Sequence, residues 1–303
     1  MLDVCLLGTG GMMPLPKRYL TSCLMRYQGE SILIDCGEGT QIALRKQGWS
    51  CKPISTIFLT HFHADHIAGL PGLLLTMGNA ERREPVTIVG PKGVGNILRA
   101  VRTIAPELPF ETNYREIEGP EDHFSVAGMD VTAFKVNHRV PCYSYEVSIR
   151  RGGRFDVARA KENNIPVKAW NPLQKGQTVE MDGQIFTPDM VLGPERKGIK
   201  VVYSTDTRPT ESIRTHAKNA DLLILEGMYG EDDRDAKARE YRHMTMTEAA
   251  RIAAEADPKE MWYTHYSPLL LHPEEYREKM QAIFPRIVMS RDGQTTEIPF
   301  EED

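Results

Sequence analysis

The sequence has few cysteines, no long apolar run and no excess of basic charge, and each shortage excludes a class of protein. Its five cysteines are odd in number and form no Cys-x-x-Cys pair, which argues against a disulfide framework and favours free thiols in a reducing compartment. No stretch approaches the roughly 18 consecutive apolar residues that a membrane-spanning helix needs. The net charge of -5 argues against a protein that coats nucleic acid over its whole surface, although it permits a local basic element.

The first seven residues are mostly apolar, but the run is too short for an export signal. It contains Asp3 and leads directly into Gly8-Thr9-Gly10-Gly11, so it is expected to form a first strand. We therefore expect a cytoplasmic protein. The 303 residues are enough for one large domain or two small ones.

Short β-branched and apolar runs alternate with helical patterns through most of the chain. Strands are predicted at residues 4–7, 22–27, 32–35, 56–60, 86–89, 131–136, 144–149, 200–204, 222–225, 261–264 and 287–289, and helices near 38–47, 67–77, 94–104, 246–256 and 274–283. This alternation is typical of a layered α/β or α+β domain. Residues 150–194 interrupt it with Gly, Pro and charge, and predict an inserted arm with at most a short helix near 156–163.

The strongest functional signal is Thr60-His61-Phe62-His63-Ala64-Asp65-His66, directly after a predicted buried strand. Three imidazoles and a carboxylate cannot be buried so close together without partners, and a metal site supplies them. Alternation puts His61 and His63 on one side of an extended segment. Asp65 and His66 continue into the turn, where they can serve a second ion. The alternative is a surface loop that happens to be rich in histidine.

This motif resembles that of the metallo-β-lactamase superfamily, whose members hold one or two metals through it and through three later ligands. The resemblance implies that the later ligands follow strands in the order His, Asp, His, and His138, Asp206 and His265 occupy such positions. It also implies an α+β fold, a four-layer αβ/βα sandwich. A single domain would then cover residues 1–303, with a flexible arm inserted at residues 150–194.

Within the superfamily the chain is most similar to ribonuclease Z, the endonuclease family that removes the 3′ trailer of precursor tRNA and leaves a 3′-hydroxyl on the tRNA. The similarity implies two zinc ions per subunit, with manganese or iron as alternatives. His61, His63 and His138 would hold one ion, Asp65, His66 and His265 the other, and Asp206 would bridge them. The segments that carry the similarity are Asp35-Cys36-Gly37-Glu38-Gly39-Thr40-Gln41, Ile67-Ala68-Gly69-Leu70-Pro71-Gly72-Leu73, His138-Arg139-Val140-Pro141, Ser204-Thr205-Asp206-Thr207-Arg208 and His243-Met244-Thr245.

The resemblance also implies catalytic roles for three residues. Asp65 would accept the proton of the attacking water. His243 would lie near the scissile phosphate and would stabilise the transition state or protonate the leaving 3′ oxygen, and Glu226 would orient it. The alternative for His243 is membership of the charged surface run 231–242.

The first half of the predicted arm is strongly basic. Residues 150–176 contain seven basic and two acidic residues, a net charge of +5, which leaves -10 for the rest of the chain. In ribonuclease Z an arm inserted here binds the tRNA elbow, so Arg154, Lys168 and Lys175 are candidates for RNA binding. A solvated charged face is the alternative. Trp170 either stacks on a base or caps a small apolar cluster.

The Gly8–Gly11 turn resembles a phosphate-binding loop, but Met12-Met13-Pro14 follows where a helix would have to begin. A tight loop near the site, carrying Lys17 and Arg18 toward the RNA, is favoured instead. Three functions remain open at this point. They are a zinc-dependent tRNA 3′-processing endoribonuclease, a hydrolase of the same fold that acts on a small phosphodiester, lactone or thioester, and a metal-binding scaffold without turnover. The resemblance to ribonuclease Z also implies a homodimer.

Overall fold

Two seven-stranded sheets with helices against them form the first of two compact units in the computed structural model, which describes residues 1–230 and 232–302. The first unit contains residues 1–148 and 200–299, and the second contains residues 149–199 and the chain from residue 300. Residue 231, the start of the charged run 231–242, lies outside the described part. Within that part, no helix combines the length and the apolar character needed to cross a bilayer.

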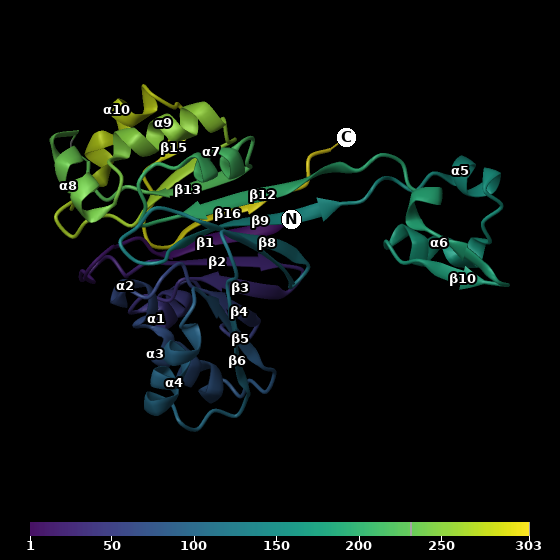
Figure 1. Cartoon of the computed structure of the whole chain (residues 1–303), viewed down its shortest axis with the longest axis horizontal. Coiled ribbons are helices and arrows are strands. Elements are labelled where there is room, and N and C mark those ends of the chain that lie inside the picture. The colour runs from purple at the N-terminus through teal and green to yellow at the C-terminus, as the bar shows by residue number, and fades with distance from the viewer. Residues whose placement is uncertain (231, 303) are drawn as a thin grey trace. The chain divides into compact units, whose positions relative to one another are not determined.

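The first sheet has the strand order β16, β1, β2, β3, β4, β5, β6. Its first four strands pair antiparallel, and β3 to β6 run parallel to one another. The strands are β16 (Gln294–Ile298), β1 (Leu2–Gly8), β2 (Ser22–Tyr27), β3 (Glu30–Ile34), β4 (Ile54–Phe58), β5 (Val86–Gly90) and β6 (Thr112–Glu116). Helices α1 (Thr40–Lys46), α3 (Leu70–Asn79) and α4 (Val94–Ile104) lie against one face of this sheet (Figure 1). In α4 the buried Val94, Leu98 and Val101 recur at helical spacing, so one stripe of the helix faces the core.

The second sheet has the strand order β15, β14, β13, β12, β9, β8, β7, and β12 to β15 run parallel. Its strands are β15 (Ile287–Val288), β14 (Met261–Thr264), β13 (Leu222–Glu226), β12 (Arg196–Ser204), β9 (Tyr143–Arg151), β8 (Met129–Lys135) and β7 (Glu121–Val126). Helices α7 (Glu211–Ala217), α9 (Met246–Ala256) and α10 (Arg277–Gln281) lie against its outer face. The shorter elements of this unit are α2 (Ala64–Ile67), η2 (Asp232–Arg234), α8 (Asp235–Tyr241) and η3 (Pro273–Tyr276).

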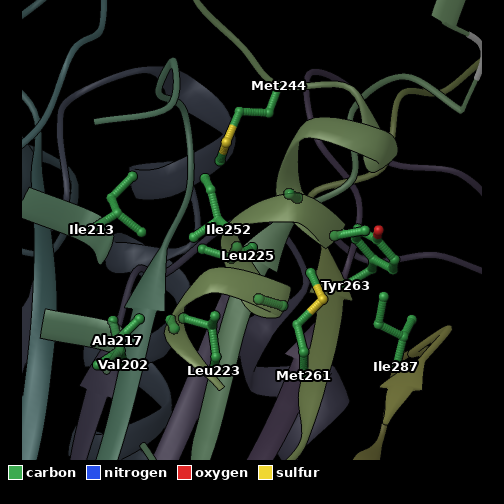
Figure 2. Close-up of a cluster of buried hydrophobic side chains, with 14 of the residues drawn as sticks. Val202, Ile213, Ala217, Leu223, Leu225, Met244, Ile252, Met261, Tyr263 and Ile287 are labelled. Atoms are coloured by element: carbon green, nitrogen blue, oxygen red, sulfur yellow. The ribbon is translucent and has the colours of Figure 1, made fainter. Parts of the chain in front are cut away.

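Buried apolar side chains fill the space between each sheet and its helices, and aromatic side chains join the two sheets. Figure 2 shows the cluster on the second sheet, where Leu223 and Leu225 of β13 face Ile252 of α9. Between the sheets, the Phe58 ring lies 5.3 Å from the ring of Tyr145, whose hydroxyl donates to the Leu59 carbonyl at 2.6 Å. The first unit is therefore helix, sheet, sheet and helix in succession, and the predicted four-layer α+β sandwich is confirmed.

The predicted helix at residues 67–77 is wrong at its start. The chain forms the separate turn α2 at 64–67, and α3 begins only at Leu70. Between them Gly69 donates its N–H to the Cys36 carbonyl, and a Cβ on Gly69 would lie 2.1 Å from the Gly37 carbonyl oxygen. This close backbone contact, together with Pro71 in the first turn of α3, ends α2 and makes α3 a separate helix.

The second unit has a small core of its own. It contains α5 (Val157–Glu162), α6 (Val167–Gln174), the hairpin of β10 (Val179–Met181) and β11 (Gln184–Phe186), and η1 (Pro188–Met190), which is more structure than the single short helix predicted here. Leu173 and Phe186 are buried in this core. Trp170 packs against it with its ring 5.2 Å from that of Phe155, and its Nε1 donates to the Ile165 carbonyl at 3.0 Å. Of the two roles predicted for Trp170, the structure therefore favours the cap of an apolar cluster.

Candidate metal centre

The predicted metal ligands lie beyond the ends of strands at one edge of the first unit's sheets. Two of the strands, β12 and β14, belong to the parallel part of the second sheet, whose carboxyl ends meet at a common edge. The turn expected after His63 is the short helix α2, for which His63 is the N-cap. The seven positions are His61, His63, Asp65 and His66 after β4, His138 after β8, Asp206 after β12 and His265 after β14.

Four of these residues form a first group, in which the possible ligand atoms of His61, His63, His138 and Asp206 all lie within 4.8 Å of one another. His63 Nδ1 is 2.8 Å from His61 Nε2 and 3.4 Å from His138 Nε2. Asp206 Oδ1 lies 3.8 Å from His61 Nε2 and 3.9 Å from His138 Nε2. Two imidazoles thus face one oxygen of a single buried carboxylate, and the His63 ring lies against both of them.

Asp65, His66 and His265 form a second group. The Nε2 atoms of His66 and His265 are 3.2 Å apart, and Asp65 Oδ2 lies 3.3 Å from His265 Nε2. The other oxygen of Asp206, Oδ2, lies 3.1 Å from each of these two imidazole Nε2 atoms. Asp206 therefore turns one oxygen toward each group, as a bridging carboxylate would.

The two groups fit a divalent metal. At several contacts one imidazole nitrogen faces another, and two lone pairs at such distances are favourable only with a proton or a cation between them. Asp206 Oδ2 is buried and accepts no hydrogen bond from the described residues, which is costly unless a cation approaches it. Imidazole and carboxylate donors suit zinc, manganese and iron alike.

Burial sets the protonation of the histidines in the first group. It lowers the pKa of His61, His63 and His138 below the usual histidine range, so these imidazoles are neutral and keep the lone pair that a metal needs. Burial alone would raise the pKa of Asp206. The neighbouring imidazoles, that of His265 foremost, outweigh it and hold this pKa well below the usual range, so the carboxylate stays ionised.

His243 and Glu226 form a buried pair at the edge of this cluster. His243 Nδ1 lies 2.9 Å from Glu226 Oε2, and Glu226 Oε1 accepts the Thr207 N–H at 2.7 Å. Burial lowers the pKa of His243, but the Glu226 carboxylate outweighs it and raises this pKa to about 9. His243 could also complete a third donor group with Asp206 and His265. Since this raised pKa keeps the imidazole protonated at neutral pH, without a lone pair for a metal, the structure favours a protonated imidazole beside the two groups over a ligand.

Comparison with known proteins identifies the fold. Residues 2–155 match the sequence family described as "Anti-Pycsar protein Apyc1". Residues 147–266 match the family described as "Beta-lactamase superfamily domain". The crystal structure of human tRNase Z, short form, is 25% identical, covers 98% of this chain and 100% of that chain, and superposes with a TM-score of 0.71. The metallo-β-lactamase fold predicted from the sequence is thereby confirmed.

Relatives that match the whole length decide the family. A protein named Ribonuclease Z from Lachnospira eligens is 56% identical over 303 residues, all of both chains. Another of that name, from Agathobacter rectalis, is 55% identical over the same share. The chain belongs to the ribonuclease Z family. It is accordingly a hydrolytic endoribonuclease on the metallo-β-lactamase fold, and the predicted resemblance is confirmed.

Asp35, whose role was not predicted from the sequence, orients one of the proposed ligands. Asp35 is fully buried, and its Oδ2 lies 2.8 Å from His66 Nδ1, which leaves His66 Nε2 facing the second group. Asp35 Oδ1 accepts the backbone N–H of Thr60 at 2.9 Å, so the same carboxylate holds the start of the histidine motif. Its backbone adopts φ 60°, a left-handed conformation that an aspartate tolerates better than most residues. A spacing within one segment could not reveal this contact, because it joins the segments that follow two neighbouring strands.

Asp35→Asn is expected to lower metal affinity about 10- to 100-fold, as is usual when the partner of a metal-binding histidine is altered. The amide has one acceptor oxygen, so it cannot accept from both Thr60 and His66 as the carboxylate does. Competition with a chelator of known affinity measures the change. Unaltered metal affinity in a folded Asp35→Asn protein would contradict this role for Asp35.

Arg208 fastens the segment that carries His243. Its guanidinium makes a two-pronged ion pair with Glu248 and donates to the His243 carbonyl at 2.6 Å. Glu248 is also part of the capping box at the start of α9, where it accepts the Thr245 N–H at 3.0 Å. Because Arg208 stands two residues after Asp206, one loop holds both the Asp206 carboxylate and the backbone of His243.

The glycine turn predicted near the site does lie against it. A Cβ on Gly11 would be 2.6 Å from the His265 ring, and the Met12 N–H donates to Asp65 Oδ2 at 2.7 Å. Arg18 has a structural role that the sequence analysis did not anticipate. Its guanidinium donates to the carbonyls of Leu270 and Leu271 at 2.8 and 3.1 Å, which joins two loops beside the site.

The three candidates for RNA binding, Arg154, Lys168 and Lys175, are exposed and belong to the second unit. Lys168 and Lys175 stand seven residues apart at the two ends of α6, so they share one side of the helix about 10 Å apart along its axis. Over residues 149–199 the net charge is +3, because this longer range contains nine basic and six acidic residues. The basic excess is therefore a property of the first half of this unit.

Proposed function

We propose that the protein removes the 3′ trailer from precursor tRNA by hydrolysing one phosphodiester bond, with the 3′-hydroxyl left on the tRNA and the phosphate on the trailer. The observation that carries this proposal is the complete set of seven histidine and aspartate side chains gathered around Asp206, in a chain of the ribonuclease Z family. The similarity to human tRNase Z, short form, supports tRNA as the substrate.

Two zinc ions per subunit are the proposed cofactors, with manganese or iron as alternatives that the same donors accept. His61, His63 and His138 would hold one ion, Asp65, His66 and His265 the other, with Asp206 shared between them. When bound, two such cations activate a water and neutralise charge on the reacting phosphate oxygens.

The protein's own side chains would move the protons. Nearby imidazoles, with His66 foremost, outweigh burial and lower the pKa of Asp65, so its carboxylate is ionised and can accept the proton of the attacking water. The raised pKa of His243 keeps that imidazole protonated at neutral pH, ready to donate to the leaving 3′ oxygen. Glu226 stabilises the protonated ring and orients it through the 2.9 Å contact.

The decisive experiment incubates the metal-loaded protein with a tRNA that carries a 3′ trailer and maps the new ends, beside a small phosphodiester. We expect a single cut next to the discriminator nucleotide and a 3′-hydroxyl on the tRNA product. Hydrolysis of the small substrate without a cut in the precursor would instead support the alternative, a hydrolase of small phosphodiesters. Absence of turnover on both would support a metal-binding scaffold.

The second unit is proposed to bind the body of the tRNA through Arg154, Lys168 and Lys175. Exposed cations release counterions when they meet an RNA backbone, which gives affinity without reading the sequence. Lys168 and Lys175 make no ion pair with any residue described, so their charges are not neutralised within the chain.

Replacing Lys168 and Lys175 together by glutamine should raise KM for precursor tRNA. The slope of log KM against log salt concentration should become shallower by about one unit for each lysine. Turnover of a small phosphodiester should be unchanged, because no residue of the first unit is altered. Kinetics at several salt concentrations provide the measurement, with Lys52→Gln/Lys92→Gln as a control pair of exposed lysines from the first unit. An equal loss on both substrates would count against docking by this unit.

A homodimer is also proposed. The apolar side chains Ile42 of α1 and Leu75 of α3 are exposed, and a hollow of about 620 Å³ opens beside α1, lined in part by Ile42 and Trp49. Exposed apolar surface of this kind is typical of protein contacts. Light scattering should give twice the subunit mass, and Ile42→Asp should reduce it to a monomer. A wild-type monomer at micromolar concentration would exclude the dimer.

The proposed location is the cytoplasm, because all five cysteines are buried free thiols and a reducing compartment preserves them. The pKa of the Cys142 thiol is raised by burial, which suppresses the reactive thiolate. Fractionation of cells that express a tagged chain would test the location, and recovery outside the cytoplasmic fraction would contradict it.

A further inference from the structure

A hollow of about 170 Å³ adjoins the segment that carries the His243–Glu226 pair. Tyr229, Tyr276, Arg234, Lys237 and Leu269 are among its lining residues. Its walls come from the loop after β13, the loop after β14, η2, α8 and η3. In sheets with parallel strands, ligands bind in the crevice outside the carboxyl ends of the strands, and two of these loops leave such ends.

Tyr229 connects this hollow with the catalytic residues. It stands three residues after Glu226, and its ring centre lies 6.4 Å from that of His243. The Met246 N–H donates to the Tyr229 carbonyl at 2.8 Å, which fixes the tyrosine backbone to the segment that follows His243. A group bound against Tyr229 therefore lies beside the imidazole that we propose as the proton donor.

The chemistry of the lining suits a nucleotide. Two tyrosine rings offer surfaces for a flat base, and the charged side chains among the described lining residues are the cations Arg234 and Lys237. Arg234 has an exposed partner, Asp233, at 3.8 Å, whereas Lys237 pairs with no residue in the described part of the chain. Leu269, 87% exposed beside them, offers apolar surface to a bound base.

A second wall of the hollow is formed by Tyr276, which packs closely on the loop after β13. The Tyr276 ring packs on Gly230, where a Cβ would lie 2.6 Å from the ring carbons. Any other residue at position 230 would push Tyr276 away, so a glycine is needed to keep the hollow in its present shape. A preformed wall lowers the entropy cost of binding a flexible single strand.

We propose that this hollow binds the nucleotide on the 5′ side of the cut, the last one that stays on the tRNA, with its base on Tyr229 and its phosphate near Lys237 and Arg234. The assignment rests on the proposed function. If His243 donates its proton to the leaving 3′ oxygen, the ribose that carries this oxygen lies on the side of His243, and Tyr229 is the aromatic ring next to it. Stacking without hydrogen bonds to base edges would accept any of the four bases.

The test combines a tyrosine variant with precursors that lack one base. We expect Tyr229→Ala to raise KM for precursor tRNA roughly tenfold, and Tyr229→Phe, which keeps the ring, to restore the wild-type KM. A precursor that is abasic on the 5′ side of the cut should lose about the same factor with the wild type and nothing further with Tyr229→Ala. Tyr114→Ala, an exposed tyrosine on β6, is the control, and metal content and melting temperature report on folding.

The possible outcomes separate this inference from the proposed function. Wild-type cleavage at the expected bond, with an abasic effect that Tyr229→Ala leaves unchanged, would overturn the subsite and leave the function intact. If Tyr229→Ala instead abolishes the effect of an abasic nucleotide on the 3′ side of the cut, a trailer nucleotide occupies the hollow and the assignment is wrong. A wild-type protein that leaves the trailer attached would overturn both.

Discussion

Asp206→Ala is expected to lower cleavage of precursor tRNA more than about 1,000-fold and to remove most of the bound metal. The reason is the position of this carboxylate, since Oδ1 faces His61 and His138 while Oδ2 faces His66 and His265 at 3.1 Å. No neighbouring side chain can replace a group that serves both sets of ligands. Metal per subunit, measured by elemental analysis beside single-turnover rates, tests the expectation.

A second buried aspartate provides the matched control for this experiment. Asp221 stands just before β13, where it accepts the Lys200 N–H at 2.8 Å and pairs with Lys259 at 2.7 Å. Asp221→Ala should lower stability without loss of metal, because this residue lies at the amino end of the strand and the metal groups lie at the carboxyl ends. An Asp206→Ala protein that keeps its metal and its rate would refute the bridging role.

His243→Ala should lower the single-turnover rate on precursor tRNA by about 100- to 10,000-fold, the usual contribution of a positioned proton donor, while metal content stays the same. His243 is not one of the seven proposed ligands, and its Nδ1 is held by Glu226 at 2.9 Å. Loss of rate without loss of metal would distinguish proton donation from metal binding. Full activity in His243→Ala at unchanged metal content would refute the assignment.

The pH profile gives this prediction a second measurement. Glu226 raises the pKa of His243 to about 9, so the proton donor is present at neutral pH and is lost as the pH rises through that value. Glu226→Gln removes the negative charge, lowers the pKa of His243 and should move the descending limb of the rate profile toward lower pH. A descending limb that does not move would mean that another group controls it.

Four of the seven proposed metal ligands could be predicted from the residues alone, because they lie within one six-residue motif. The other three were implied by the resemblance to the metallo-β-lactamase superfamily, whose pattern places His, Asp and His after later strands. Strand ends that share one edge of a sheet bring such residues together, and the structure gathers all seven. Glu226 and His243 were also expected to meet, and they do.

The supporting contacts could not be predicted, because they join segments that are distant in sequence. Asp35 reaches His66 only because β3 and β4 are neighbours, and Arg208 reaches Glu248 across 40 residues. Neither pair of residues has a characteristic spacing in the sequence by which it could be recognised. Hydrogen bonds of this kind are visible only once the strand order is known.

The strands and helices that were not predicted from the sequence are mainly polar strands and short helices. No residue of β6 is fully buried, and β7 buries only Phe124, so the apolar pattern that reveals a strand is weak at these sheet edges. β16 was missed for the same reason, since Ile298 is its single buried residue. Helices α7 and α8 have seven residues each, too few for a helical repeat to stand out.

The pairing of β16 with β1 has a consequence for how the cell makes this nuclease. Asp292, next to β16, accepts the backbone N–H groups of Thr9 and Tyr19 at 2.9 and 2.5 Å, and so anchors the glycine turn that packs on His265. Thr9 and Asp292 are 283 residues apart, so the ribosome must translate almost all of the described chain before this anchor exists. A chain that is still being translated would therefore lack a finished site until β16 pairs with β1.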